Sequence, residues 1–175
     1  VPYFQAKMEA ETTCSDLCKQ GQVDAVISED TDVLAYGCPV FLTKINTSTD
    51  TCILINYDKV LENLGLSAGQ FLDFCIMCGT DYNKNIFKIG PEKAFKLIKQ
   101  YNTIEEIGIS GIDIACLNHK RVRELFLGYE KHTDKIPYCK SIDFNAFHKF
   151  LFTNMFFFNI SYTSCGMSKY ISLAS

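Results

Sequence analysis

The stretch DAVISEDTDVLAYG, residues 24–37, decides the fold. It begins as a short apolar run typical of a β-strand and continues into three acidic residues, two of which, Asp30 and Asp32, are one residue apart. Residues i and i+2 point the same way in an extended chain but do not face each other on a helix. Asp30 and Asp32 therefore converge only at the end of a strand or in a turn.

The same spacing occurs earlier in the chain. Glu9 and Glu11 follow the strand-like run VPYFQ, residues 1–5, and Asp81 follows an apolar helical run. Open α/β sheets place ligand sites at the carboxyl ends of their strands, so we expect all five carboxylates to gather there. Carboxylates without nearby His or Cys select Mg²⁺, or Mn²⁺ in its place, and two such ions promote phosphodiester hydrolysis. The alternative is that Asp30 caps a following short helix.

Local patterns predict the order of the elements. Short β-branched or aromatic runs predict strands near residues 1–5, 24–28, 39–44 and 52–56, and residues 46–50 predict a hairpin-like connection. Helical periodicity predicts helices near residues 8–20, 57–64, 68–78 and 91–101, and a further helix with exposed basic residues in 120–129. This order predicts an α/β sheet followed by a more helical C-terminal half.

Composition narrows the class of protein. The 175 residues suffice for about one domain, and no apolar run approaches the roughly 20 residues of a membrane-spanning helix. Nine cysteines, an odd number without a secretory signal, indicate free thiols in a reducing, intracellular compartment. The chain begins with Val1, so we expect an internal start.

Charge is unevenly distributed around a formal net charge of −3. Acids dominate residues 1–32, whereas residues 83–99 hold five lysines against one glutamate. This distribution suits a metal site beside a phosphate-binding element, and the alternative is two solvated faces.

The lysine-rich run NIFKIGPEKAFKLIKQY, residues 85–101, has the features of a phosphate-binding helix start. Gly90 permits a tight turn and Pro91 fits the first helical position. Backbone N–H groups at such a start bind phosphate, and neighbouring lysines add charge; the predicted DNA-binding residues are Lys84, Gly90, Lys93 and Lys96. The alternative is an ordinary amphipathic helix whose inward face is formed by Ala94, Phe95, Leu97 and Ile98.

Four motifs together resemble a known family. VPYFQAKMEAE, SEDTDVLAYG, FCIMCGTDY and IGPEKAFKLI, in this order and spacing, resemble the internal nuclease region of the flap endonucleases, which include the xeroderma-pigmentosum-G nuclease. The resemblance covers about residues 1–110 and implies a PIN-like or resolvase-like sheet flanked by helices. It implies a nuclease region over residues 1–78, a helix-two-turn-helix over 79–110 and a helical extension over 111–175.

The resemblance also implies an activity. It implies a Mg²⁺-dependent 5′ flap endonuclease and 5′ exonuclease of DNA replication and repair, acting in the nucleus or a viral replication compartment on branched or flapped DNA. Matched by motif, the metal ligands and catalytic residues are Glu9, Glu11, Asp30, Asp32 and Asp81. Residues 82–98 match the helix-two-turn-helix, commonly with a bound K⁺. No sliding-clamp motif occurs near the C-terminus, and no membrane partner is expected.

Two departures from the family pattern matter. At the turn of the helix-two-turn-helix, Lys88 replaces a glycine and Phe87 replaces a nearby arginine. The N-terminal family region, which supplies two further aspartates, is absent from this sequence. The alternative to an enzyme is therefore a catalytically incomplete, DNA-binding remnant. A helical stripe of Phe147, Phe150, Leu151 and Met155 is interpreted as core packing.

Overall fold

The computed structural model describes residues 5–7, 9–131, 143–153, 158–161 and 170–173. Contacts between Cα atoms divide the chain into two units, Phe4–Lys135 and a smaller unit formed by Val1–Tyr3 with Ile136–Ser175. The larger unit contains the five predicted carboxylates and the lysine-rich run. The predicted domain boundaries at residues 78 and 110 lie inside this unit.

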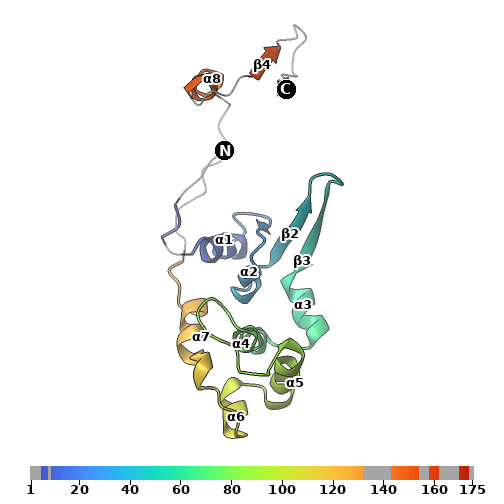
Figure 1. Cartoon of the computed structure of the whole chain (residues 1–175), viewed down its shortest axis with the longest axis vertical. Coiled ribbons are helices and arrows are strands. Elements are labelled where there is room, and N and C mark those ends of the chain that lie inside the picture. Colours follow the sequence, from blue (N-terminus) through green and yellow to red (C-terminus); the bar gives the residue numbers. More distant parts are fainter. Residues whose placement is uncertain (1–4, 8, 132–142, 154–157, 162–169, 174–175) are drawn as a thin grey trace. The chain divides into compact units, whose positions relative to one another are not determined.

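A small mixed sheet forms the first part of the larger unit (Figure 1). Its order is β1-β2-β3, with β1 (Val26–Ile27) parallel to β2 (Val40–Asn46) and β2 antiparallel to β3 (Thr51–Asn56). The three predicted strands and the hairpin connection between β2 and β3 are therefore confirmed. The predicted strand over residues 1–5 lies almost wholly outside the described residues.

Helices make up most of the rest of this unit, and capping sets their ends. Asn56 accepts a hydrogen bond from the Lys59 N–H at the start of the third helix, which ends at left-handed Gly65. Ser67 and Gln70 form a capping box at the start of the fourth. The helices are α1 (Ala10–Lys19), α2 (Asp32–Ala35), α3 (Tyr57–Leu64), α4 (Ala68–Cys78), α5 (Pro91–Tyr101), α6 (Ile104–Ile109), η1 (Ala115–Leu117) and α7 (His119–Leu127).

Two apolar clusters hold these elements in place. The smaller lies between α1, α2 and the sheet and centres on Val33 and Phe41, both without solvent exposure. The larger surrounds α4, which packs against α5 and α7 (Figure 1), and includes Ile76, Ile98 and Phe126. The two clusters hold the start of α2 and the end of α4 in the same unit. These two positions carry or adjoin predicted carboxylates. No described helix is long and apolar enough to cross a membrane.

The smaller unit contains α8 (Phe144–Thr153) and an antiparallel pair, β4 (Phe158–Ser161) with β5 (Tyr170–Leu173). The sequence analysis predicted a helix here but not these strands. On α8, Phe147 is partly buried and Phe150 is 58% exposed, so the described part of the predicted stripe does not form a buried core. The placement of Met155 and the side chain of Leu151 lie outside the described part of the chain.

One face of the sheet carries an exposed apolar row. Ile27, Leu42 and Leu54 are cross-strand partners in adjacent strands, and Ile27 and Leu54 are each 64% exposed. The neighbouring cross-strand row, containing Val26 and Phe41, is buried in the smaller cluster. Large exposed apolar rows favour association between molecules.

We expect the double substitution Ile27→Lys with Leu54→Lys to shift the purified chain towards monomer. The two lysines remove apolar surface from water and add like charge to the same face. Sedimentation velocity across a concentration series measures the change, and Ile109→Lys, which replaces an exposed residue on α6, is the control. A wild-type chain that stays monomeric at high concentration contradicts this prediction.

Candidate functional site

Four of the five predicted carboxylates lie at helix starts or in the turn before one, and the fifth lies in a turn after a helix. Glu9 is the N-cap of α1 and Glu11 lies in its first turn. Asp30 lies in the turn between β1 and α2, and Asp32 is the first residue of α2. Asp81 lies in the turn that follows α4. Negative charge is favoured at helix N-termini, so the local structure tolerates these acids at α1 and α2.

The pKa of Asp32 is affected by carboxylates from two other segments of the chain. Burial, then the charges of Asp30, Asp81 and Glu11, raise the pKa of Asp32 from its ordinary value of 3.8 to about 6. Residues from the starts of α1 and α2 and from the turn after α4 therefore converge in space. Glu9 does not contribute to this shift, but its charge, together with that of Asp32, raises the pKa of Tyr82. The metal-binding role of the five residues stays a prediction.

Local hydrogen bonds hold the acidic turn in place. The Asp30 carboxylate accepts from the backbone N–H of Asp32 at 2.9 Å, and the Ser28 hydroxyl oxygen accepts from the Asp30 N–H at 3.0 Å. Asp30 thus stabilises the start of α2, as the capping alternative predicts, although the N-cap residue itself is Thr31. Asp30 therefore both caps the start of α2 and lies close enough to Asp32 for its charge to raise the Asp32 pKa.

Glu29, the acid beside Asp30 and not one of the five predicted ligands, has contacts of its own. Its carboxylate accepts a hydrogen bond from the Lys44 backbone N–H at 3.0 Å and another from the Thr43 hydroxyl at 3.4 Å. Glu29 therefore ties the acidic turn to β2. Its charge is not among the causes of the raised Asp32 pKa.

A tyrosine pair joins α2 to the turn that carries Asp81. The hydroxyl groups of Tyr36 and Tyr82 lie 2.9 Å apart, and both rings pack against Phe126, with centroid distances of 4.7 and 5.4 Å. Burial and the Tyr36 hydrogen bond raise the pKa of Tyr82. Because Tyr82 is next to Asp81, the pair fixes Asp81 relative to α2. The sequence analysis missed this contact.

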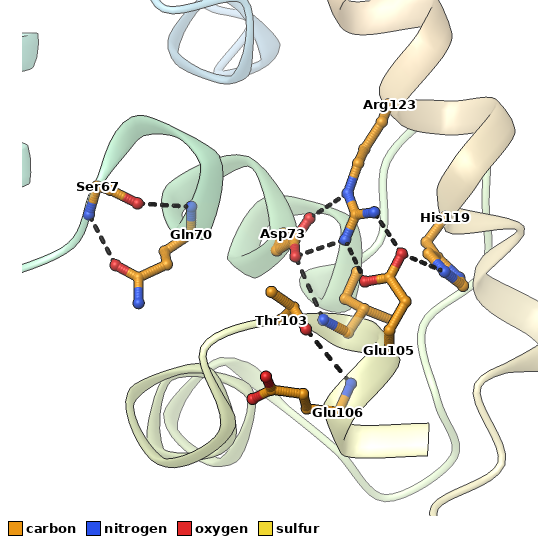
Figure 2. A network of polar contacts seen from close by, with 9 residues as sticks. Ser67, Gln70, Asp73, Thr103, Glu105, Glu106, His119 and Arg123 are labelled. Carbon is orange, nitrogen blue, oxygen red and sulfur yellow. Dashed lines mark hydrogen bonds and ion pairs between the residues drawn. The ribbon is translucent and has the colours of Figure 1, made fainter. Parts of the chain in front are cut away.

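A partly buried ion-pair network joins α4 to α6 and α7 (Figure 2). The guanidinium of Arg123 lies between two carboxylates, donating to Asp73 at 2.6 Å twice and to Glu105 at 2.6 and 2.9 Å. Asp73, whose side chain is only 4% exposed, also accepts from the Ile104 N–H at 3.3 Å, and His119 contacts Glu105 at 3.1 Å. The Arg123 hydrogen bonds hold the pKa of Glu105 at about 2.

The sequence analysis did not find this network. Its prediction that the basic residues of α7 are exposed is wrong for Arg123, because that side chain pairs with Asp73 and Glu105. A signal was present in the run FLDFCIMC, where Asp73 is the only charged residue among apolar neighbours. A buried carboxylate requires a cationic partner, but its sequence position does not identify which cation that is.

The donor chemistry of the acidic cluster fits a hard divalent cation. Glu11, Asp30, Asp32 and Asp81 offer only carboxylate oxygens, which Mg²⁺ prefers. In the part of the chain that the structure describes, no group of three or more His, Cys, Asp or Glu side chains lies close enough to hold a metal ion. These residues therefore supply ligands of the right type but do not form a closed site.

The CxxC pair Cys75 and Cys78 lies in α4 and packs against the larger cluster. Burial raises the pKa of both thiols, that of Cys75 to about 12. Metals bind thiolates, and these thiols stay protonated at neutral pH. Both side chains therefore belong to the packing of the core around α4.

The lysine-rich run forms α5 as predicted. Gly90 is its N-cap, Pro91 is its first residue, and the buried Ala94 and Ile98 confirm an amphipathic helix. The predicted DNA-binding lysines, Lys84, Lys93 and Lys96, are all exposed. Lys99 differs, because its ammonium group donates to the carbonyls of Leu64 and Gly65 at 3.3 and 2.9 Å and so closes the end of α3.

Sequence comparisons identify related proteins. Residues 1–81 match the family model described as the XPG I-region. The chain is 40% identical over 160 residues to a probable RAD2-like endonuclease of Invertebrate iridescent virus 3, covering 80% of this chain and 41% of that protein. It is 40% identical over 136 residues to flap endonuclease 1 of Xenopus tropicalis, covering 73% of this chain and 35% of that protein. The chain thus spans about two fifths or less of these relatives.

Solved structures share the fold. Flap endonuclease-1 from Methanococcus jannaschii matches with a TM-score of 0.72 at 28% identity, over 88% of this chain and 48% of that one. The catalytic core of Rad2, solved with a DNA substrate, matches with a TM-score of 0.76 at 20% identity, over 87% and 59% of the two chains. These matches confirm the predicted α/β nuclease fold. The chain belongs to the XPG and flap endonuclease family, with residues 1–81 as its I-region.

Proposed function

We propose that this chain is the catalytic part of a Mg²⁺-dependent endonuclease that hydrolyses phosphodiesters in flapped or branched DNA, with 5′ exonuclease activity on the same ends. The observation that carries the proposal is the convergence of Glu11, Asp30 and Asp81 on Asp32, which raises the pKa of Asp32. The names of the relatives, flap endonuclease 1 and RAD2-like endonuclease, support the same activity.

The acidic cluster is the proposed metal site. Glu11, Asp30, Asp32 and Asp81 would hold Mg²⁺, with Mn²⁺ as a substitute, whereas the charge of Glu9 acts on Tyr82 and is not among the causes of the Asp32 shift. When bound, a pair of such ions supplies Lewis-acid activation of water and stabilisation of the leaving oxygen. A junction-resolving relative, GEN1, was solved with product DNA and a Mg²⁺ ion, which supports this choice of metal. No contact among the described residues supports K⁺ at the turn before α5.

The exposed lysines and the start of α5 are the proposed grip on the DNA backbone. Lys84, Lys93 and Lys96 are exposed and would pair with phosphates. Gly90 precedes the first turn of an 11-residue helix, where backbone N–H groups point outwards and attract anions. Contacts of this kind position the duplex without reading its sequence, as a structure-specific nuclease requires.

A second function is a DNA-binding module without catalysis. The observation that favours it is that, among the described residues, no group of three or more His, Cys, Asp or Glu side chains lies close enough to hold a metal ion. In such a module the lysines bind DNA and the acids hold metal too weakly for hydrolysis. Both functions include DNA binding, so a binding assay cannot distinguish them. A cleavage assay can.

The test is cleavage of a labelled 5′-flap duplex by the purified chain in Mg²⁺, resolved on a denaturing gel. We expect a cut at the base of the flap that EDTA and Asp30→Ala abolish. The control Asp58→Ala removes an acid from the first turn of α3, outside the cluster, and should leave cleavage unchanged. A folded chain that binds the duplex without cutting it indicates the binding module, and a chain that neither binds nor cuts contradicts both functions.

A further inference from the structure

A tight turn between α4 and α5 carries Phe87 at its tip. The backbone N–H of Ile89 donates to the carbonyl of Ile86 at 3.0 Å, which closes a turn around Phe87 and Lys88. Lys88 has φ of 61°, in the left-handed region, whereas Phe87 is not among the described residues with positive φ. This combination matches a type II turn, whose third position favours glycine. Lys88 thus adopts a backbone conformation that favours glycine.

The loop that presents Phe87 is anchored on both sides. Ile89 is buried and Ile86 packs against the larger cluster. The side chain of Asn83 donates to the carbonyl of Ile76 at the end of α4, at 2.8 Å. Phe87 is nevertheless 85% exposed. The fold therefore holds a large aromatic ring in water on a fixed support.

Lysines surround this ring. The Lys88 ammonium lies 5.2 Å from the centroid of the Phe87 ring, within cation–π range. Lys84 in the same loop and Lys93 and Lys96 on α5 are exposed, and none of the four lysines forms an ion pair with another described residue. An exposed aromatic ring among unpaired lysines complements nucleic acid, which offers phosphates beside flat, apolar base and sugar faces.

We propose that Phe87 and Lys88 together contact DNA, with the Phe87 ring packed on a nucleobase or deoxyribose and the Lys88 ammonium paired with an adjacent phosphate. This inference rests on the proposed function, because it takes DNA as the ligand, and it assigns a residue that determines affinity there. The strained backbone at Lys88 fits this role, since strain of this kind persists where a structure presents a ligand contact. The lysines contribute phosphate contacts, which salt weakens. The ring contributes stacking or apolar packing, which salt does not screen.

The test measures binding rather than cleavage, with the full chain and EDTA present. Fluorescence anisotropy gives the Kd for a labelled 5′-flap DNA and for a fully paired, nicked duplex over a series of salt concentrations. We expect Phe87→Ala to raise the Kd about tenfold and Phe87→Trp to restore it, because aromatic stacking is the lost contact. The slope of log Kd against log salt should stay constant for Phe87→Ala and fall by about 1 for Lys88→Gln. Ile109→Ala, which truncates a residue of similar exposure on α6, is the control.

The change in Kd on the two DNAs shows whether Phe87 contacts DNA and which part of the DNA it contacts. An equal loss on both DNAs supports packing on a paired nucleotide, and a loss confined to flap DNA supports stacking on an unpaired base. An unchanged Kd for Phe87→Ala, with the unmodified chain binding DNA, overturns this inference and leaves the proposed function standing. Failure of the folded, unmodified chain to bind either DNA overturns both.

Discussion

Replacing Asp32 by asparagine is expected to reduce cleavage of a 5′-flap duplex by more than about a hundredfold, beyond the 10–100-fold typical of outer-sphere partners of a metal. It is also expected to make the metal-free chain more stable at pH 7, by about 1 kcal/mol after solvent screening of this half-buried group. The reason is that ionised Asp32 faces three other carboxylates in the folded chain.

The sign of the pH dependence follows from the raised pKa. Between the ordinary value of 3.8 and the folded value of about 6, the folded chain binds more protons at Asp32 than the unfolded chain does. The stability contributed by protonated Asp32 is therefore lost as pH rises through this window. Urea denaturation from pH 4 to 7 should show a flatter profile for Asp32→Asn than for the unmodified chain.

Glu29→Gln is the matched control for Asp32→Asn. Glu29 lies in the same acidic turn, but its carboxylate bonds to Thr43 and Lys44 rather than facing Asp32. This substitution should leave the cleavage rate within a few-fold of the unmodified rate. Mg²⁺ should raise the melting temperature of the Glu29→Gln chain and of the unmodified chain more than that of Asp32→Asn, because bound metal stabilises the folded state. Equal cleavage by Asp32→Asn and the unmodified chain contradicts the assignment.

Replacing Asp73 by alanine is expected to lower the free energy of unfolding by about 3 kcal/mol, a large share of the roughly 5–15 kcal/mol of a typical domain. The substitution leaves Arg123 with Glu105 as its one carboxylate partner in the network and removes the acceptor of the Ile104 N–H. It loosens the packing of α4 on α6 and α7, and α4 leads into the turn that holds Asp81. Urea denaturation followed by circular dichroism measures the loss.

The same helix supplies the control. Arg121 and Glu124 form an ion pair at 3.0 Å on the exposed face of α7, where both side chains are more than 60% exposed. Arg121→Ala should therefore cost less than about 1 kcal/mol. The double substitution Asp73→Leu with Arg123→Met should cost less than Asp73→Ala alone, since it fills the space with apolar side chains and leaves no partly buried guanidinium that has lost one of its two carboxylates. Equal losses for Asp73→Ala and Arg121→Ala contradict a structural role for the network.

Most of the longer helices could be predicted from the sequence because their signals are local, whereas the short helices α6 and η1 were not predicted. The capping box at Ser67 and Gln70, the Gly65 after α3 and the Gly90-Pro91 start of α5 each lie within a few residues of the helix end they define. The β4–β5 pair in the smaller unit could not be predicted in the same way, because partners such as Ile160 and Ile171 meet only across a connection.

The candidate site was predictable in its composition but not in its supports. The spacing of Asp30 and Asp32 after a strand identifies them as candidate ligands, and four motifs in order indicate the family. The Tyr36–Tyr82 contact joins residues 46 positions apart, and the ion pair of Asp73 with Arg123 spans 50. Nothing in a local pattern selects one such partner among many.

By itself the sequence determined most of the longer helices and the strands β1, β2 and β3 of the larger unit, the family, and the supply of acids and lysines, because propensity, capping and motif spacing act over short distances along the chain. Only the tertiary structure decided which carboxylates face Asp32, that Arg123 is a partly buried partner of Asp73 rather than a free surface cation, and that Phe87 is held in water. Burial and long-range electrostatics depend on positions in space, and those exist only once the chain has folded.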